Sequence, residues 1–329
     1  MNNICFDGNY ILYKNVFTLH KMNRLYGDLW TALDNNIAKY TAMNSWERIF
    51  IVSDSNKKSW RQDELTQYKS HRTRLEDVDW DWVFKTFNEW KESVSDKCVV
   101  LQKDHIEGDD WITSIVLKMN KAGKSNVIVS SDQDLLQLVN YNINKEKSWM
   151  NLQIVDTLGS EMVYIPEGWE LWLKEYDNNR NTDIFALDNS YDAMNFFNRI
   201  IKNWQYTEVN AYAQLFKKLV MGDKSDNIKS VYEKLTTTGK IQNIGKAGAE
   251  KIWNFYKENY GIHFNTTDKT FINDVLKCVE AVNNVEFEDE RRRIVASNIR
   301  RNIKLIELHY RHYPEWVLKT IIEELNEKL

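Results

Sequence analysis

The sequence predicts an α/β protein with a central, mostly parallel sheet and a helical C-terminal part. Short apolar runs alternate with amphipathic stretches over residues 1–155, whereas helical periodicity dominates from Glu208 onward. Strands that alternate with helices are typical of right-handed βαβ units around a parallel sheet. At about 150 residues per domain, a chain of 329 residues is expected to form roughly two domains.

Continuous apolar runs mark the expected strands, because a strand buried on both faces carries apolar residues at every position. The runs are Ile4–Phe6, Ile49–Val52, Cys98–Leu101 and Val127–Val129, with a weaker fifth at Leu152–Val155. Between them, Leu29–Tyr40 and Trp111–Met119 have the spacing of amphipathic helices. We therefore expect residues 1–155 to form an α/β core.

Residues 156–208 are interpreted as an inserted or connecting segment, in which Gly168–Tyr176 and Asp192–Trp204 look helical. Residues 209–329 are expected to form a helical subdomain. Its predicted helices are Tyr212–Met221, Lys246–Tyr260, Phe271–Val282, Ile299–Leu308 and Pro314–Leu329. Pro314 at the start of one helix and Gly261 after the end of another fit the usual positions of these residues.

Composition excludes several classes of protein. A hydrophobic fraction of 43% is too high for a disordered chain. No stretch approaches the ~18 apolar residues of a membrane-spanning helix, and the N-terminus lacks a signal-peptide pattern, so a cytoplasmic protein is expected. Cys5, Cys98 and Cys278 are isolated in apolar runs, which predicts buried thiols rather than disulfides or a zinc site.

Acidic residues follow all four of the stronger predicted strands. They are Asp7, Asp54, Glu107, Asp109, Asp110, Asp132 and Asp134. Any one of them alone would be explained as a cap or a turn residue. The carboxyl ends of parallel strands share one edge of a sheet, however, so all seven are expected to lie close together.

Seven ionised carboxylates in one place require a counter-charge, because like charges a few ångströms apart repel strongly. Hard divalent cations such as Mg²⁺ and Mn²⁺ prefer oxygen ligands. No His or Cys pair accompanies these acids, which disfavours zinc. The sequence therefore predicts a magnesium or manganese site at this edge of the sheet.

A basic segment follows the second strand. Residues 55–74 contain two acidic residues and six basic ones, which are Lys57, Lys58, Arg61, Lys69, Arg72 and Arg74. Trp60 and Tyr68 lie between them, and aromatic faces beside phosphate-binding cations are typical of single-stranded nucleic acid binding. A solvated helix with a few aromatic anchors is the alternative. The net charge of −4 does not exclude DNA, because the acids assigned to metal binding account for more than this excess.

Five motifs then occur in an order that resembles the 5′-nuclease (flap endonuclease) superfamily. They are Phe6-Asp7-Gly8, Lys57–Arg72, Glu107-Gly108-Asp109-Asp110, Ser130–Asp134 and Met221-Gly222-Asp223-Lys224-Ser225-Asp226-Asn227-Ile228. The resemblance spans residues 1–155 and 210–329. It is strongest to phage 5′→3′ exonucleases of the T-even ribonuclease H type.

The resemblance implies the roles of particular residues. It adds a helical arch or clamp at about residues 55–95 and a helix–three-turn–helix DNA-binding element to the fold. The first metal cluster is matched by Asp7, Asp54, Glu107, Asp109 and Asp132, and the second by Asp110, Asp134, Asp223 and Asp226. Lys69 and Arg72 fall where relatives hold the scissile phosphate, and Tyr10 falls near the place where they stack a base or position the 5′ end.

One region departs from the family pattern. The family commonly continues from the position of Ile228 into a Gly-rich turn, whereas Lys229–Gln242 intervenes here before Asn243–Gly248. Ala247 also replaces the usual Lys. Gly245, Lys246 and Gly248 are still expected to contact the duplex backbone, and a K⁺ ion is a further candidate at this turn.

The implied function is a divalent-metal-dependent, structure-specific 5′ nuclease, a 5′→3′ exonuclease or flap endonuclease that hydrolyses phosphodiesters with two metal ions. Expected substrates are DNA with 5′ flaps, nicks or 5′ ends and RNA/DNA hybrids, as in removal of RNA primers during phage-type DNA replication. A replication clamp or a single-strand-binding protein is a candidate partner. Two alternatives remain: a PIN-type single-strand ribonuclease and a relative that binds flaps or junctions without cleaving them.

Overall fold

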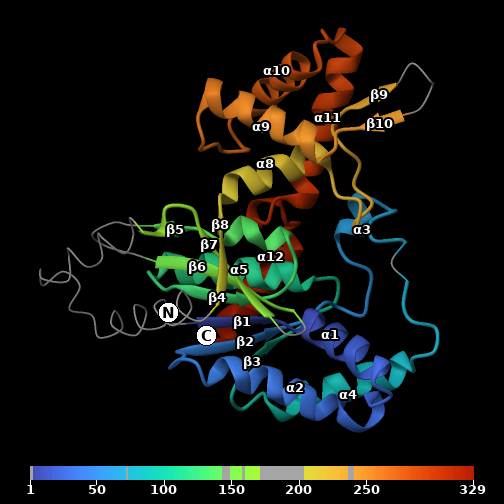
Figure 1. Cartoon of the computed structure of the whole chain (residues 1–329), viewed down its shortest axis with the longest axis vertical. Helices are drawn as coiled ribbons and strands as arrows, with labels where there is room; N and C mark the ends of the chain where they lie inside the picture. The colour runs from blue at the N-terminus through green and yellow to red at the C-terminus, as the bar shows by residue number, and fades with distance from the viewer. Residues whose placement is uncertain (1–2, 72, 143–148, 158–159, 171–203, 236–240) are drawn as a thin grey trace, which may run out of the picture. The chain divides into compact units, whose positions relative to one another are not determined.

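The structure is a computed structural model, and it describes all residues except 1–2, 72, 143–148, 158–159, 171–203 and 236–240 (Figure 1). By its internal contacts the chain forms two compact units. The first, the sheet unit, comprises Met1–Trp60, Arg74–Val209 and His309–Leu329. The second, the helical unit, comprises Arg61–Thr73 and Asn210–Leu308.

The sheet unit contains a sheet with the strand order β3-β2-β1-β4-β6-β7-β8, and β5 pairs with β6. The strands are β1 (Asn3–Asp7), β2 (Arg48–Val52), β3 (Val99–Leu101), β4 (Asn126–Val129), β5 (Tyr141–Asn142), β6 (Trp149–Thr157), β7 (Ser160–Pro166) and β8 (Gln205–Val209). Neighbours from β3 to β6 along this order are parallel. Strand β7 is antiparallel to β6 and parallel to β8. All five predicted strands are thus confirmed in a mostly parallel sheet.

Helices cover both faces of this sheet (Figure 1). On one face lie α1 (Gly8–Lys21), α2 (Leu25–Thr41) and α4 (Trp80–Ser93), and on the other lie α5 (Gly108–Lys121) and α12 (Glu315–Lys328). Short 3-10 helices, η1 (Asp134–Leu138) and η3 (Tyr310–His312), complete the unit. The strand residues Ile4, Cys5 and Phe6 are fully buried, as expected when both faces are covered.

The helical unit packs its helices around a core of its own. It contains α3 (Arg61–Glu64), α8 (Ala211–Met221), α9 (Lys246–Tyr260), α10 (Phe271–Asn283), α11 (Asp289–Ile306) and a hairpin of β9 (Glu233–Leu235) and β10 (Ile241–Asn243). Phe216, Trp253 and Val279 are among its buried core residues. The four helices predicted between residues 212 and 308 are confirmed, although α11 begins ten residues before the predicted Ile299.

The unit boundaries differ from the expected domains in three places. Strands β7 and β8 extend the sheet into the region expected to be an insertion. Residues His309–Leu329 belong to the sheet unit, whereas Arg61–Thr73 belong to the helical unit. The expected helix Gly168–Tyr176 is described only as far as Glu170, and Trp169 and Glu170 are helical; the expected helix Asp192–Trp204 lies outside the described residues except for Trp204.

The expected helical arch is also corrected. Among the described residues of 55–95, the helices are α3, which has four residues, and α4, which packs into the core of the sheet unit. The fold is therefore confirmed as α/β, while among the described residues between Asp54 and Trp80 no helix is longer than the four residues of α3.

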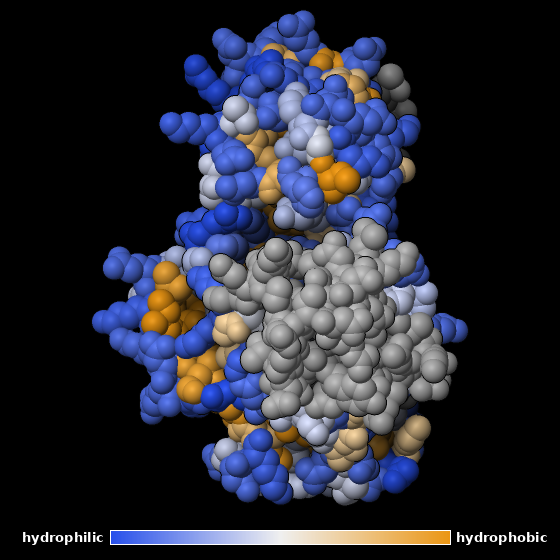
Figure 2. All heavy atoms as spheres, turned by 90° about the vertical axis from the view of Figure 1, so that its left-hand side faces the viewer, coloured by the Kyte–Doolittle hydropathy of each residue, from blue (hydrophilic) through white to orange (hydrophobic). Residues whose placement is uncertain are grey.

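All three cysteines are buried and free, as predicted. Within the described part of the chain, no helix has the length and apolar character needed to cross a membrane. The visible surface of the described residues is mainly hydrophilic, with hydrophobic areas between hydrophilic ones (Figure 2).

Candidate metal centre

The parallel strands bring the predicted acids of the sheet unit to one edge. Strands β3, β2, β1 and β4 run side by side in the same direction, so their carboxyl ends share this edge. Asp7 ends β1, Asp54 follows β2, and Asp132 follows β4. The loop after β3 leads to Glu107 and into α5, which starts at Gly108. The topology brings Asp7, Asp54 and Asp132 to this edge, and the convergence of all seven acids there remains a prediction.

Asp7 is held from two directions. Its Oδ1 accepts a 3.0 Å hydrogen bond from the backbone N–H of Tyr10 in α1, and its Oδ2 accepts a 2.7 Å bond from the hydroxyl of Ser130 after β4. Burial raises the pKa of Asp7 to about 6, and the nearby charges of Asp54 and Asp132 add to the rise while both hydrogen bonds oppose it. Carboxylates from three different strands therefore interact electrostatically, and a cation among them would relieve the repulsion.

Backbone contacts also fix Asp54. Its Oδ1 accepts a 2.7 Å hydrogen bond from the backbone N–H of Gly108, at the start of α5. Its own backbone N–H donates to the side chain of Asn9 at 3.1 Å, and its carbonyl accepts from the amide of Gln102 at 2.7 Å. The ends of β2 and β3 are thereby tied to the start of α1 and α5.

The acids of α5 lie at its N-terminus. Oδ2 of Asp110 accepts the backbone N–H of Glu107 at 3.1 Å and the indole N–H of Trp60 at 2.9 Å. The side chain of Asp110 is fully buried, and that of Glu107 is nearly so. A helix N-terminus stabilises negative charge, so the start of α5 is a favourable position for these two acidic side chains.

The loop after β4 is pinned by a neighbouring strand. Asp132 accepts a 2.8 Å hydrogen bond from the backbone N–H of Asp134, and its own N–H donates to the hydroxyl of Ser130. The amide of Gln153, from β6, donates to the carbonyls of Ser130 and Asp132 at 2.9 and 2.7 Å. These contacts give the Asp132–Asp134 turn a defined position relative to β1.

Asp223 and Asp226 belong to the helical unit, in the turn after α8. Backbone bonds of 2.8 and 2.7 Å join Asp223 to Ile228 and close the turn. Gly222 has a φ of +74°, and an added Cβ would lie 2.4 Å from the carbonyl of Ile228, so this position requires glycine. One carboxylate oxygen of Asp223 and one of Asp226 lie within 4.8 Å of each other. Their convergence with the acids of the sheet unit remains a prediction.

Lys218 and Ser225 hold the carboxylate of Asp223. Burial alone would raise the pKa of this group, but the ammonium of Lys218 at 2.5 Å and the hydrogen bonds from Ser225 outweigh it and lower the pKa. Asp223 is therefore kept ionised, as a metal ligand must be.

Only some side chains of the basic segment, residues 55–74, are exposed at the surface. Trp60, Arg61 and Tyr68 are 1%, 2% and 3% exposed, which corrects the expectation that they contact nucleic acid directly. Trp60 bonds to Asp110, Arg61 donates to the carbonyl of Leu305, and Tyr68 lies in the core of the helical unit. In the sequence these three residues stand next to charged residues, which suggests an exposed surface. In the structure they are buried by residues that are distant in the sequence.

The remaining basic residues stay candidates for phosphate contacts. Lys57 and Lys58 are exposed, and Lys57 pairs with Asp104 at 2.6 Å. Arg74 is exposed and lies over the rings of Trp80 and Phe84, with its guanidinium carbon 5.6 and 4.8 Å from their centroids. A cation held on aromatic faces has a restricted position, which suits it to a directed phosphate contact.

Lys69 is placed by the same turn that holds Asp226. It has a φ of +54°, and its backbone N–H donates to the carbonyl of Asp226 at 3.2 Å. The turn thus ties the proposed phosphate-binding lysine to a predicted metal ligand within one unit. Arg72 lies outside the described residues.

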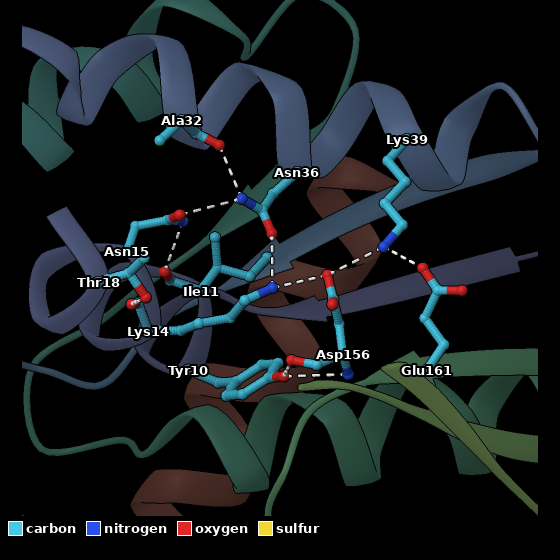
Figure 3. Close-up of polar contacts among 10 residues, drawn as sticks. All are labelled: Tyr10, Ile11, Lys14, Asn15, Thr18, Ala32, Asn36, Lys39, Asp156 and Glu161. Atoms are coloured by element: carbon cyan, nitrogen blue, oxygen red, sulfur yellow. Dashed lines mark hydrogen bonds and ion pairs between the residues drawn. The ribbon is translucent and has the colours of Figure 1, made fainter. Parts of the chain in front are cut away.

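Tyr10 does not have a free hydroxyl for substrate. Its Oη donates to the carbonyl of Asp156 at 2.6 Å and accepts the backbone N–H of Asp156 at 3.1 Å (Figure 3). The carboxylate of Asp156 in turn pairs with Lys14 at 2.6 Å and Lys39 at 3.2 Å. This network ties α1 and α2 to the end of β6, and it keeps α1 in place behind Asp7.

The turn at Gly245 begins a helix of 15 residues, α9. Gly245 and Lys246 are exposed there, and Gly248 is half-buried. The backbone N–H groups at such a helix start attract phosphate, and the duplex contact at this turn remains a prediction. Strands β9 and β10 occupy part of the segment that interrupts the family pattern before this turn.

A cavity of about 660 Å³ lies beside Asp54 in the sheet unit. Asn9, Tyr13, Arg74, Asn88 and Gln102 are among the residues that line it. Sequence reasoning missed it, together with the supporting residues Ser130 and Gln153. Gln153 did leave a signal, because it is a polar residue inside a predicted buried strand.

Comparison with known proteins agrees with this architecture. Residues 2–163 match the model of a family described as the 5′-3′ exonuclease, N-terminal resolvase-like domain. The chain is 27% identical over 251 residues to a 5′-3′ exonuclease of Mycoplasmopsis pulmonis and 30% identical over 149 residues to one of Buchnera aphidicola. These alignments cover 76% and 43% of this chain and 65% and 50% of the relatives, so the chain spans about half to two thirds of their length.

Solved structures show the same fold along the whole chain. The 5′-exonuclease of phage T5 matches with a TM-score of 0.55 and 14% identity, covering 99% of this chain and 98% of that one. A T5 flap endonuclease in a complex with DNA and metal ions matches with a TM-score of 0.59 and 15% identity, over 99% and 98% of the two chains. Together with the family match over residues 2–163, this defines the class of protein that the chain resembles, the 5′-nuclease superfamily.

Within that superfamily, the match to one branch is limited. The ribonuclease H of Enterobacteria phage T4 is 27% identical over 130 residues, which is 36% of this chain and 42% of that protein. The comparisons thus confirm the predicted resemblance to the superfamily. The expected likeness to the T-even branch is one of several likenesses to members of this superfamily.

Proposed function

We propose that this protein is a divalent-metal-dependent 5′ nuclease that hydrolyses phosphodiesters near 5′ ends of DNA or of RNA annealed to DNA. The observation that carries the proposal is the placement of Asp7, Asp54 and Asp132 at the carboxyl ends of three neighbouring parallel strands, which share one edge of the sheet. Relatives named as 5′-3′ exonucleases and a T5 structure with metal ions support it.

The donor set suits hard cations. All the predicted ligands are carboxylates, and those of Asp7, Asp54 and Asp132 are held by backbone or side-chain donors. When bound, two ions would activate a water molecule and stabilise charge on the leaving oxygen. Asp7, Asp54, Glu107, Asp109 and Asp132 would hold one ion, and Asp110, Asp134, Asp223 and Asp226 the other. We favour Mg²⁺, with Mn²⁺ as a substitute.

Basic and polar residues would place the substrate. Lys69 and Arg72 would bind the non-bridging oxygens of the scissile phosphate, where preorganised charge favours the transition state. The cavity beside Asp54 would admit an unpaired nucleotide, with Arg74 near its phosphate and Asn88 near its base. The start of α9, at Gly245–Gly248, would contact the phosphates of the duplex, and K⁺ is a candidate ion there.

A cleavage assay tests the proposal. The full chain is incubated with 5′-labelled flap, nicked, blunt and RNA-primed duplexes, with Mg²⁺, with Mn²⁺ or with EDTA. We expect metal-dependent products with 5′ phosphates, loss of cleavage in Asp132→Asn, and normal cleavage in Asp96→Asn, which changes an exposed acid away from this edge. Binding of a flap without cleavage would indicate a binding-only relative. Cleavage of single-stranded RNA alone would indicate a PIN-type ribonuclease.

A further inference from the structure

The buried side chain of Trp60 donates a hydrogen bond to Asp110, a predicted metal ligand. We propose that Trp60 is a positioning residue whose indole N–H sets the orientation of the Asp110 carboxylate for metal binding. This inference rests on the proposed function, because it gives a role to a residue beside the same centre. It replaces the stacking role that the sequence alone indicates for Trp60.

The contact has the geometry of a fixed support. The indole nitrogen of Trp60 lies 2.9 Å from Oδ2 of Asp110, and the backbone N–H of Glu107 reaches the same oxygen at 3.1 Å. Trp60 is 1% exposed and Asp110 is 0% exposed, so water does not compete for this bond. Two donors on one oxygen define both the rotamer of Asp110 and the plane of its carboxylate.

Trp60 is itself held by two other segments of the sheet unit. Its backbone N–H donates to the carbonyl of His105 at 3.1 Å, in the loop that leads to Glu107. Its ring lies 5.9 Å from that of Tyr313, and the Tyr313 hydroxyl reaches the carbonyl of Asp110 at 3.4 Å. Residues far apart in the sequence therefore meet around Trp60 and Asp110, so the indole cannot turn away without disturbing several contacts.

The support has a chemical consequence. An N–H donor stabilises the ionised form of a buried carboxylate, which is the form that binds a cation. Removal of such a partner of a metal ligand commonly weakens metal affinity by about 10- to 100-fold. We expect a loss in this range when the donor is removed while the ring is kept.

Trp60→Phe removes the donor, and Trp90→Phe is the matched control. Trp90 is also fully buried in the sheet unit. Its indole N–H donates a 2.7 Å hydrogen bond to Oδ1 of Asp34, and Asp34 is not one of the predicted metal ligands. Mn²⁺ affinity and stoichiometry are measured by calorimetry on the metal-free full chain, with thermal unfolding recorded with and without Mn²⁺. Replacement of Trp60 by benzothienylalanine, which keeps the bicyclic shape without the N–H, serves where Trp60→Phe fails to fold.

The expected result is a loss of about 10- to 100-fold in affinity for one ion on removal of the Trp60 donor, with Trp90→Phe within about twofold of the unsubstituted chain. Unchanged affinity without the Trp60 donor, or an equal loss in Trp90→Phe, would overturn the positioning role while leaving the nuclease proposal intact. An unsubstituted chain that binds no Mn²⁺ would instead defeat the proposed function, and the role of Trp60 with it.

Discussion

The backbone N–H of Gly108 donates a 2.7 Å hydrogen bond to Oδ1 of Asp54, which joins the first residue of α5 to the loop after β2. An added Cβ at Gly108 would lie 3.3 Å from that same oxygen. The close approach means that the identity of residue 108 controls where the Asp54 carboxylate lies.

Gly108→Ala is therefore expected to lower metal affinity and cleavage with little loss of stability. Alanine favours a helix over glycine by about 0.5–1 kcal/mol, but its methyl group would displace the Asp54 carboxylate by a few tenths of an ångström. Gly27→Ala in α2 is the control, because a Cβ there meets nothing within 4 Å. It should gain stability without a change in activity. Equal activity in the two variants, measured by cleavage rate and Mn²⁺ titration, would remove the constraint assigned to Gly108.

Asp7→Asn should abolish cleavage and stabilise the metal-free protein. Burial raises the folded pKa of Asp7 to about 6, above its unfolded value of about 3.9, so the folded state binds this proton more tightly. The protonated form favours folding fully below the unfolded pKa, and this advantage is lost as the pH rises toward 6. At pH 7 the ionised carboxylate costs roughly 2–3 kcal/mol, which the neutral Asn avoids.

The check is urea unfolding of both proteins in EDTA at pH 7 and at pH 4. The stability gain of Asp7→Asn should be present at pH 7 and should shrink at pH 4. If Asp7→Asn were less stable than the unsubstituted protein at pH 7, the ionised form of Asp7 would not be destabilised by its surroundings.

Asp156→Asn should destabilise the sheet unit at neutral pH, and less so at acidic pH. Burial acts to raise the pKa of Asp156, but Lys14 and Lys39 outweigh it and lower the pKa. A depressed pKa contributes stability above the unfolded value of about 3.9, and this contribution is lost as the pH falls through the folded pKa. We expect a loss of roughly 1–3 kcal/mol at pH 7 that narrows toward pH 3.

The matched control for Asp156 is Asp28→Asn, which breaks an exposed pair with Arg24 one helical turn away. Such pairs contribute about 0.3–0.5 kcal/mol. Thermal unfolding at pH 7 and pH 3 compares the two variants, and a loss for Asp156→Asn no larger than that of the control would mean that the network in Figure 3 adds little.

Lys69→Ala should lower turnover far more than duplex affinity. Its backbone is held by Asp226, and its ammonium is expected to act on the phosphate that reacts. Lys57→Ala, which removes an exposed lysine paired with Asp104, should mainly weaken binding and reduce its salt dependence. Single-turnover rates and binding at several salt concentrations separate these effects. Equal losses of rate and affinity in Lys69→Ala would move this residue from catalysis to binding.

Much of the fold follows from local patterns in the sequence. Strands such as Ile4–Phe6 are apolar at every position because both of their faces are covered, and the acids that end them are visible without a structure. Strand β8 was missed because four of its five residues are exposed, so it lacks an apolar run. The start of α11 was missed because Arg291 and Arg293 lie on its exposed face.

The site was predictable where it depends on residue type and order, and not where it depends on distant partners. Trp60 and Tyr68 look alike in the sequence, as aromatic residues among cations. One supports Asp110 and the other joins the core of the helical unit. The hydrogen bonds that Gln153 and Ser130 contribute likewise depend on the order of strands in the sheet, which local patterns do not specify.

Anomalous scattering from crystals soaked in Mn²⁺ tests the central claim most directly. We predict two manganese peaks, at least one of them within coordination distance of carboxylate oxygens of Asp7 and Asp132, and loss of that peak in Asp132→Asn. Crystals that diffract well and show no peak at this edge of the sheet, while protein from the same drop cleaves flap DNA, would contradict a carboxylate metal centre.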